Sequence, residues 1–390
     1  MIAVRKHIRC AVPAMVMILL ALLVSSCGTP FFSKEQRDRL DKAIAAFMTE
    51  HHFPGVMVGA WVPGKGTYVV ARGKSDLETG KPLRIDDKFG AGSVTKSIVA
   101  TVLLQLVDEG KLKLDDKVNK YFSWVPNGEN ITVRELLNMT SGLYNYTEDK
   151  TLLAAAVADP AKKWAPEELA RVGVSGTSYF PPGRGWYYSN TNTILIGLII
   201  EKITGNKLEA EVKKKITDRL GLKNTYFPEG PAMTAPYTLG YNFDEEAKQY
   251  VEAARIDPSL LWAAGAMVSD LQDMRVWAGA LGTGQLISKA MQKERERFHD
   301  MVPPGLPEPA NGMDPGYGLA MVKYDNTNNF IGITGRTNAY DTQVFYLPSD
   351  DTTLITFANT NTADGDGPLF FATISRIIFP GSFPKVISSQ

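Results

Sequence analysis

The sequence predicts an α/β (α+β) fold, in which strands from both ends of the chain form one sheet and a mainly helical region is inserted between them. Three observations support this prediction. β-rich runs occur early in the 390-residue chain and again beyond residue 315. Capped helical segments dominate the stretch between them. The hydrophobic fraction of 44% allows a sizeable core and excludes an intrinsically disordered chain.

Residues 1–26 are typical of a secretory signal peptide of the lipoprotein type. Basic residues precede an uncharged apolar stretch, 11–24, and small residues follow it. The small residues end at Cys27, as in a bacterial lipobox, so we expect Cys27 to carry lipid and 27–33 to act as a tether. An uncleaved N-terminal anchor helix is the alternative. Both interpretations tether the domain, 34–390, to a bacterial membrane, in the periplasm or outside the cell.

The domain is predicted to consist of a mixed α/β part, 34–115 and 265–390, and a helical insertion, 116–264. At its start, Ser33 and Gln36 form a capping-box pattern in front of apolar residues at helical spacing. The pattern then predicts strands over Val56–Val62 and Thr67–Arg72 and a buried helix over Ser93–Glu109.

Later elements follow from caps and from β-rich runs. Helices are predicted from the capping box Thr132–Glu135, from Pro166, over Asn192–Lys202 before Gly205, and after a cap formed by Ser269 with Gln272. Strands are predicted over Tyr317–Tyr324, Phe330–Gly335, Thr342–Leu347 and Thr353–Ala358, and a closing helix over Leu369–Phe379. The pattern alone suggests a mixed sheet.

The composition argues against several classes of function. Basic and acidic residues balance at 42 each, without the basic excess of a nucleic-acid binder. Two cysteines cannot form a disulfide scaffold or a four-cysteine zinc site. The histidines beyond the signal segment, His51, His52 and His299, are too few for a histidine-rich metal site, and we interpret them as structural or surface residues. We expect neither a metal nor a cofactor.

The strongest candidate for chemistry is the pattern Ser-x-x-Lys from Ser93 to Lys96, at the N-terminus of the predicted buried helix. Helical positions three apart share a face, about 5–6 Å apart at Cβ, so the Lys96 amine can reach the Ser93 hydroxyl. The helix dipole and desolvation both disfavour a charged amine there, so Lys96 could act as a base for Ser93. An N-cap serine beside an exposed lysine is the alternative.

The motifs around Ser93 resemble those of the penicillin-recognising serine hydrolases, which are the class C β-lactamases, the serine D-alanyl-D-alanine carboxypeptidases and related esterases. The resemblance spans about Glu50–Ala358 and rests on the order of Phe89–Ser97, Leu136–Leu143 and Pro182–Asn190. It implies a β-lactamase/transpeptidase-like fold, with an antiparallel sheet flanked by helices, and an acyl-enzyme mechanism.

The resemblance also implies roles for four residues. Ser93 matches the acylated nucleophile and Lys96 its proton-managing partner. Tyr188 matches the tyrosine that passes a proton to or from the leaving group, with a purely structural tyrosine as the alternative. Asn190 matches the residue that hydrogen-bonds the substrate amide and the catalytic lysine.

The third family motif departs from the usual pattern in the segment Gly-Ile-Thr-Gly-Arg that ends at Arg336. Relatives carry Lys-Thr-Gly or His-Thr-Gly, and here Ile333 replaces the cation. Thr334 can hydrogen-bond a substrate carboxylate, and Gly335 leaves room for substrate backbone along the strand. By resemblance, the backbone N–H groups of Ser93 and Arg336 form the oxyanion hole.

Further departures bear on substrate and rate. Met139 stands where many relatives have histidine, and Asn338-Ala339-Tyr340 replaces a usual Pro-Gly-Tyr. The Arg336 side chain is a candidate substitute for the missing cation, although adjacent strand residues point to opposite faces.

Our leading hypothesis is a membrane-tethered serine hydrolase that acts through an acyl-enzyme on a D-Ala-D-Ala-type peptide or a small ester or amide. Weak β-lactamase activity is compatible with it. Its expected partners are a small-molecule or peptidoglycan-peptide substrate and the membrane, through the lipid anchor, and its oligomeric state is open. The alternative, suggested by Ile333, is a catalytically weak or inactive protein that binds peptidoglycan or β-lactams.

Overall fold

The computed structural model describes residues 32–301, 315–324, 329–360 and 366–380. The expected signal peptide, Cys27 and most of the expected tether lie outside these residues. The α-helices are α1 Lys34–Glu50, α2 Val94–Asp108, α3 Val133–Leu137, α4 Lys150–Ala158, α5 Pro166–Ser175, α6 Asn190–Thr204, α7 Leu208–Val212, α8 Asp218–Leu220, α9 Leu271–Thr283, α10 Lys289–Arg295 and α11 Asp366–Ile378. No helix in the described ranges combines the length and hydropathy that a membrane span requires.

The strands form one large sheet and two small ones. They are β1 Gly55–Val62, β2 Gly66–Gly73, β3 Phe89–Gly90, β4 Tyr241–Asp244, β5 Gln249–Glu252, β6 Val268–Ser269, β7 His299–Asp300, β8 Pro315–Tyr317, β9 Val322–Tyr324, β10 Phe330–Arg336, β11 Asp341–Leu347 and β12 Thr352–Ala358.

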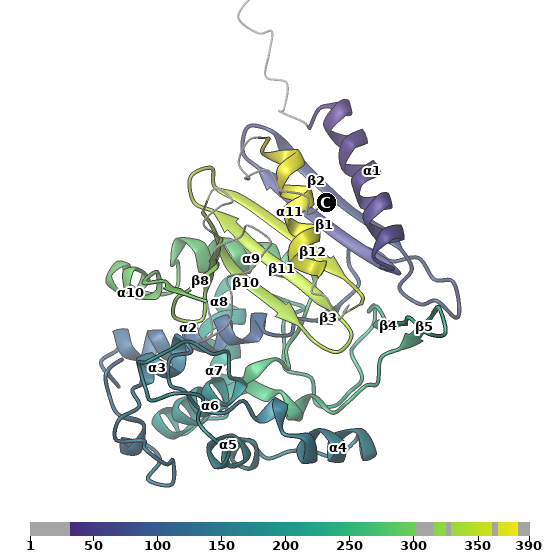
Figure 1. Ribbon diagram of the computed structural model, residues 1–390. Helices are drawn as coiled ribbons and strands as arrows, with labels where there is room; N and C mark the ends of the chain where they lie inside the picture. The colour runs from purple at the N-terminus through teal and green to yellow at the C-terminus, as the bar shows by residue number, and fades with distance from the viewer. Residues whose placement is uncertain (1–31, 302–314, 325–328, 361–365, 381–390) are drawn as a thin grey trace, which may run out of the picture.

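The large sheet joins the two ends of the described chain. Its order is β2-β1-β12-β11-β10-β9-β8-β7, so the early hairpin pairs with the last strand (Figure 1). Every pair in it is antiparallel, which confirms the antiparallel sheet and makes the mixed sheet expected from the pattern alone wrong.

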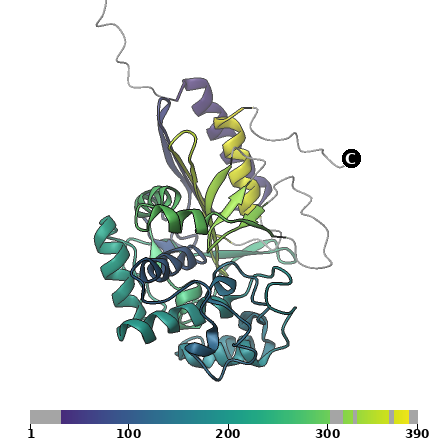
Figure 2. The ribbon, with the colours of Figure 1, turned by 90° about the vertical axis from the view of Figure 1, so that its left-hand side faces the viewer.

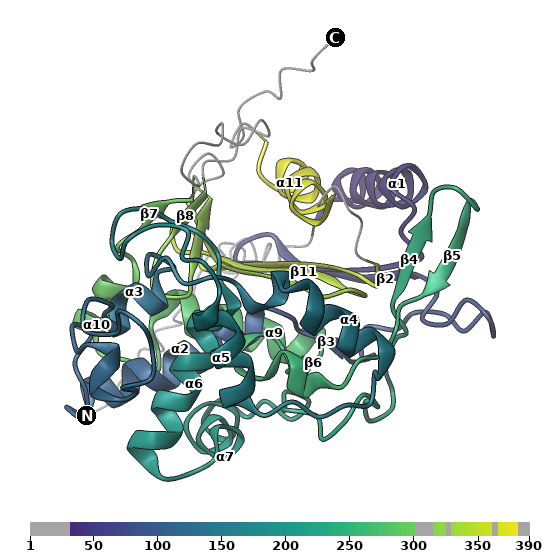
Figure 3. The same cartoon turned by 60° about the horizontal axis from the view of Figure 1, so that its bottom comes forward.

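Helices cover both faces of this sheet. α1 and α11 lie side by side on one face, and α9 and α2 lie on the other (Figures 1 and 3). The predicted capping box of α1 is confirmed, because Gln36 N–H donates to Ser33 Oγ at 3.1 Å. α1 buries Leu40, Ile44 and Phe47, at the spacing read from the sequence, so the apolar face decides how the helix docks.

The inserted region forms a separate lobe against α2 (Figure 2). Its centre is α6, which packs on α2, α3 and α5 and is buried along most of its length. α6 ends at Gly205, whose left-handed φ of 71° confirms the predicted helix stop. The region is mainly helical, as predicted, and also contains the hairpin β4–β5.

Two local predictions are wrong. The strand expected over Tyr317–Tyr324 is a hairpin of β8 and β9, because the chain turns where Gly318 N–H donates to the Met321 carbonyl at 2.8 Å. The cap expected at Ser269 is one residue too early, since Ser269 pairs in β6 and the Asp270 carboxylate caps α9 instead. A local turn sets the first boundary, and pairing with the distant strand β3 sets the second.

Candidate active site

The helix α2 carries both residues of the Ser-x-x-Lys pattern at its N-terminus. Ser93 immediately precedes the helix, but its side chain makes no capping hydrogen bond. Lys96 Nζ lies 3.0 Å from Ser93 Oγ and donates a second hydrogen bond, of 2.5 Å, to the carbonyl of Ala264. Because Lys96 is only 1% exposed, the alternative of a capping serine beside an exposed lysine is wrong.

The surroundings of Lys96 favour its neutral form. Desolvation by burial lowers the pKa of Lys96 well below its usual 10.5, and the partial positive charge of the α2 N-terminus acts in the same direction. A neutral amine can accept the Ser93 hydroxyl proton across the 3.0 Å contact. The geometry therefore supplies a base for the serine.

A tyrosine contacts the same serine oxygen from the other lobe. Tyr188 Oη–H donates to Ser93 Oγ at 2.6 Å, and its ring centre lies 4.8 Å from Lys96 Nζ. Burial raises the pKa of Tyr188, and the hydrogen bond to Ser93 offsets only part of this rise. Tyr188 therefore keeps its proton at neutral pH, while Lys96 is disposed to lose one, so an acid and a base meet at Ser93.

The loop that carries Tyr188 is fixed by Met139, the residue that stands at the usual histidine position. Tyr187 N–H donates to the Met139 carbonyl at 3.1 Å, and Asn192 Nδ2 contacts Met139 Sδ at 3.2 Å. Ser141 Oγ–H donates to Asn192 Oδ1 at 2.6 Å. Met139 thus serves as an anchor for the tyrosine loop.

Asn190 lies at the start of α6, with its side chain bound to the loop before α4. Its Nδ2 donates to Thr147 Oγ1 at 2.9 Å, and its backbone N–H donates to Asn145 Oδ1 at 3.0 Å. The hydrogen bonds of Lys96 go to other partners. The contact between Asn190 and Lys96 that the resemblance implied is therefore not made in the described part of the chain.

The strand β10 packs its backbone directly against the serine loop. A Cβ on Gly335 would lie 2.2 Å from the Ala91 carbonyl oxygen, and one on Gly92 would lie 2.8 Å from Arg336 N. Gly92 also has a φ of +54°, which favours glycine. This close approach brings the backbone N–H of Arg336 beside Ser93, where the oxyanion hole is expected.

The side chains of β10 bring no cation to this position. Ile333 is 1% exposed and shares a face of the sheet with Gly335, toward α2. Arg336 points to the opposite face, where its Nε lies 3.5 Å from Asp341 Oδ2. Thr334 is partly buried and, by the alternation of the strand, shares the face of Arg336. The guanidinium of Arg336 therefore does not occupy the place of the missing cation.

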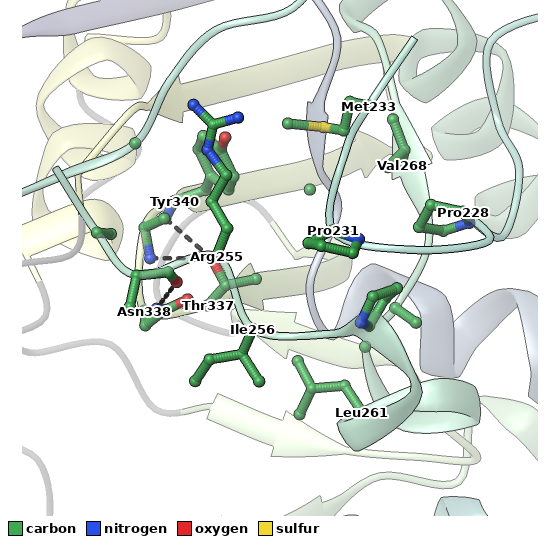
Figure 4. Close-up of a pocket in the computed structure, with 18 of the residues that line it drawn as sticks. Pro228, Pro231, Met233, Arg255, Ile256, Leu261, Val268, Thr337, Asn338 and Tyr340 are labelled. Carbon is green, nitrogen blue, oxygen red and sulfur yellow. Dashed lines mark hydrogen bonds between the residues drawn. The ribbon is translucent and has the colours of Figure 1, made fainter. Parts of the chain in front are cut away.

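A cavity of about 130 Å³ adjoins the serine loop (Figure 4). Gly90 and Gly265 belong to its wall, and Gly265 follows the residue whose carbonyl binds Lys96. Arg255 lies at the cavity and donates from Nε and Nη2 to Glu252 Oε1, at 3.0 and 2.8 Å. Much of the remaining wall is apolar, with Pro231, Met233, Ile256, Leu261 and Tyr340. A compact apolar group fits there.

The histidines lie elsewhere. His51 Nδ1 pairs with Asp366 at 3.0 Å, His52 stacks on Phe243, and His299 is exposed on β7. Within the described ranges, no three histidine, cysteine, aspartate or glutamate side chains gather closely enough to hold a metal.

Sequence reasoning missed three contributors to the site. The Ala264 carbonyl binds Lys96 through the backbone, so no side-chain pattern could reveal it. Asn145 anchors Asn190 and carries no motif of its own. Tyr317 is 1% exposed and places its ring edge-on to Tyr188, with centroids 6.5 Å apart. Only tertiary contacts identify all three.

Comparisons with known proteins show the family and the fold of the chain. The family model described as Beta-lactamase matches residues 40–371. Penicillin-binding protein 4* of Bacillus subtilis (strain 168) is 24% identical over 84% of this chain and 72% of its own length. Esterase EstB of Burkholderia gladioli is 29% identical over 66% of this chain and 69% of its own length.

A solved structure extends the likeness to the fold. The D-stereospecific amidohydrolase from Streptomyces sp. superposes with a TM-score of 0.76 at 30% identity, covering 88% of this chain and 98% of its own. Since the family model spans most of the chain, the protein belongs to the β-lactamase family of serine hydrolases.

Proposed function

We propose that this protein is an exported, lipid-anchored hydrolase that cleaves small amides, esters or D-alanyl peptides through an acyl-enzyme on Ser93. The observation that carries the proposal is the pair of contacts on one oxygen, 3.0 Å to the Lys96 amine and 2.6 Å to the Tyr188 hydroxyl. A serine between a neutral buried amine and a protonated phenol is prepared for nucleophilic attack.

The steps follow from these contacts. Ser93 Oγ attacks the carbonyl carbon while its proton moves to Lys96 Nζ, and the backbone N–H groups of Ser93 and Arg336 stabilise the oxyanion. The leaving nitrogen or oxygen takes the proton of Tyr188, which Lys96 restores. Water then attacks the ester carbonyl and releases Ser93 together with the acid product.

The substrate class is argued from the cavity and from the third motif. The apolar cavity adjoins the serine loop at Gly90 and Gly265, with Ser93 outside its wall, and suits a compact apolar group of the substrate. Ile333 leaves no cation to attract a terminal carboxylate, which favours esters and amides over substrates with a free carboxylate. Relatives named as an esterase and an amidohydrolase support this preference.

Covalent labelling tests the enzyme assignment. We expect a fluorophosphonate or a fluorescent penicillin to form an adduct on Ser93 of the wild type and none on Ser93→Ala. Folded wild-type protein that reacts with neither probe would contradict the proposal and favour the alternative of a binding protein. A panel of a p-nitrophenyl ester, a D-amino-acid amide, an acyl-D-Ala-D-Ala peptide and nitrocefin then ranks the substrates.

The substitution Ile333→His tests the account of the third motif. We expect it to raise kcat/KM for the acyl-D-Ala-D-Ala peptide and to leave the neutral ester less affected, because only the peptide ends in a carboxylate. If the peptide gains nothing, the missing cation does not govern substrate choice.

The lipid anchor is tested separately by metabolic labelling with palmitate in a bacterial host. We expect label on the wild type and none on Cys27→Ala. An unlabelled wild type, or label that survives the substitution, would contradict the anchor without bearing on catalysis.

A further inference from the structure

The Glu148 carboxylate lies among the tyrosines Tyr144, Tyr179 and Tyr187, and together we call them the tyrosine–carboxylate cluster. Tyr179 Oη–H donates to Glu148 Oε2 at 2.7 Å, and Tyr187 Oη–H contacts Glu148 Oε1 at 3.3 Å. The rings of Tyr179 and Tyr187 are 3.9 Å apart, and Tyr144 lies 5.8 Å from Tyr179. These four side chains have no part in the acyl-enzyme mechanism proposed above.

The charge of Glu148 has no cationic partner within the described chain. Its hydrogen-bond donors in the described chain are the two phenols and the Asn145 amide, at 3.1 Å, and all are neutral. The adjacent Asp149 adds a second negative charge, and burial together with the charges of Asp149 and Glu148 raises the pKa of Tyr144. Glu148 is exposed, so a dissolved cation can reach it.

The cluster is joined to the catalytic residues at two points. Tyr187 directly precedes Tyr188, whose hydroxyl contacts Ser93. On the other side, Thr147 directly precedes Glu148 and accepts the Asn190 amide at 2.9 Å. The cluster therefore adjoins both the loop that carries Tyr188 and the residue that binds the Asn190 side chain.

We infer that the tyrosine–carboxylate cluster is a substrate subsite for a positively charged ammonium group, recognised by the Glu148 carboxylate and the tyrosine rings. This inference rests on the proposed function and names its substrate class: esters, amides or peptides that carry an amine near the scissile bond. Aromatic faces and a carboxylate each attract such a cation. Ile333 acts in the same direction, because the third motif lacks the cation that would select a carboxylate instead.

Two isosteric substrates test the subsite. They are p-nitrophenyl esters whose acyl chain ends in a trimethylammonium group or in an uncharged tert-butyl group, compared at several chain lengths. For the wild type, we expect kcat/KM to favour the charged ester by about tenfold at low salt, and the preference to shrink as salt screens the charge.

The variant Glu148→Gln removes the charge and keeps an oxygen that can accept from Tyr179. We expect the charged-to-neutral ratio of kcat/KM to fall severalfold in this variant, to the smaller preference that the tyrosine rings retain. The matched control Glu129→Gln removes an exposed carboxylate outside the cluster and should leave the ratio at the wild-type value. An unchanged ratio in Glu148→Gln would overturn the inference.

A binding measurement tests the subsite without requiring hydrolysis, and it uses a second substitution in addition to Glu148→Gln. We expect calorimetry to detect benzyltrimethylammonium binding to the wild type, weakened about tenfold in Glu148→Gln and also weakened in Tyr187→Leu, which removes one aromatic face. Benzyl alcohol is the neutral probe. If neither ester is hydrolysed, the proposed hydrolase function is contradicted. Calorimetry would then still show whether the cluster binds the ammonium probe. Hydrolysis without any charge preference would contradict the subsite alone.

Discussion

At the scale of single residues, the chemistry of the site depends on two shifted proton equilibria at Ser93. Burial lowers the pKa of Lys96 and raises that of Tyr188. The two groups thus hold opposite proton states around neutral pH, the amine free to accept and the phenol able to donate. Neither shift needs a neighbouring carboxylate, because desolvation alone is sufficient to change both.

The buried lysine makes stability depend on pH. The pKa of Lys96 in the folded protein is below 10.5, the usual value of a lysine in the unfolded chain. At a pH between these two pKa values, the unfolded chain therefore binds one more proton than the folded protein. Relative to Lys96→Met, the wild type should lose about 1.4 kcal/mol per pH unit as the pH falls from 10.5 to the folded pKa, and nothing further below it. Chemical denaturation of both proteins across this range measures the difference.

The exposed lysine Lys293 supplies the control for this prediction. Lys293→Met should show no comparable pH-dependent difference from the wild type, because an exposed amine is solvated in both states. A flat difference for Lys96→Met as well would mean that Lys96 is not desolvated in solution.

Removal of the phenol should separate amides from activated esters. Tyr188→Phe deletes the hydroxyl that contacts Ser93 and should lower kcat for an amide by about 10²–10⁴-fold, since an amine cannot leave without a proton. A p-nitrophenyl ester should lose less, because its leaving group departs as an anion. Steady-state kinetics on both substrates checks this. Tyr68→Phe, whose hydroxyl contacts Asp41, is the control, and equal losses on both substrates would contradict the role of Tyr188.

At the scale of elements, the proposed oxyanion hole depends on how closely β10 approaches the loop before α2. Two glycines allow the approach, Gly92 on the loop and Gly335 on the strand. The identity of the side chains on β10 matters less for this geometry, since Ile333 lies in the core and Arg336 on the far face. The strand therefore contributes its backbone to the site.

A methyl group at this contact should disturb both stability and activity. Gly335→Ala places a Cβ 2.2 Å from the Ala91 carbonyl, so we expect a loss of about 1–3 kcal/mol of unfolding free energy and a large fall in kcat/KM. Gly279→Ala in α9 has open space around the new Cβ and should instead stabilise the protein by about 0.5–1 kcal/mol with activity retained. Urea denaturation and ester kinetics compare the two, and a fully active Gly335→Ala would contradict the close approach.

At the scale of the whole molecule, the two ends of the described chain close the fold on the face opposite the site. α1 packs beside α11, and Phe47 joins them through a contact of 5.0 Å between its ring centre and that of Phe370. This seam stabilises the sheet on one face, whereas α2, which Ser93 directly precedes, lies on the other face (Figure 3).

Stability and catalysis should therefore respond independently to a change in this seam. Phe47→Ala removes a buried ring and should cost about 3–5 kcal/mol of unfolding free energy, while kcat well below the melting temperature stays close to the wild-type value. Calorimetry and ester kinetics on the same sample measure the two effects. A fall in kcat in fully folded protein would show that the seam is coupled to the site.

The parts of this fold that could be predicted are those set by short-range rules. The Ser93–Lys96 pairing, the capping boxes of α1 and α3 and the stop at Gly205 depend on residues within a few positions of one another. Such features follow from helix geometry, which is the same in any protein. The resemblance added the tyrosine, whose role no local spacing could supply.

The sequence by itself determined the fold class, the order of the elements and the serine–lysine pair, because periodicity, caps and motif order are written along the chain. Only the tertiary structure decided which atoms meet from far apart. Tyr188 contacts Ser93 across 95 positions, and the Ala264 carbonyl reaches Lys96 across 168. The burial that shifts the pKa values of Lys96 and Tyr188 comes from the packing of the two lobes. The tyrosine–carboxylate cluster around Glu148 likewise brings together residues from separate loops. Long-range packing has no local pattern, so these features required the folded molecule.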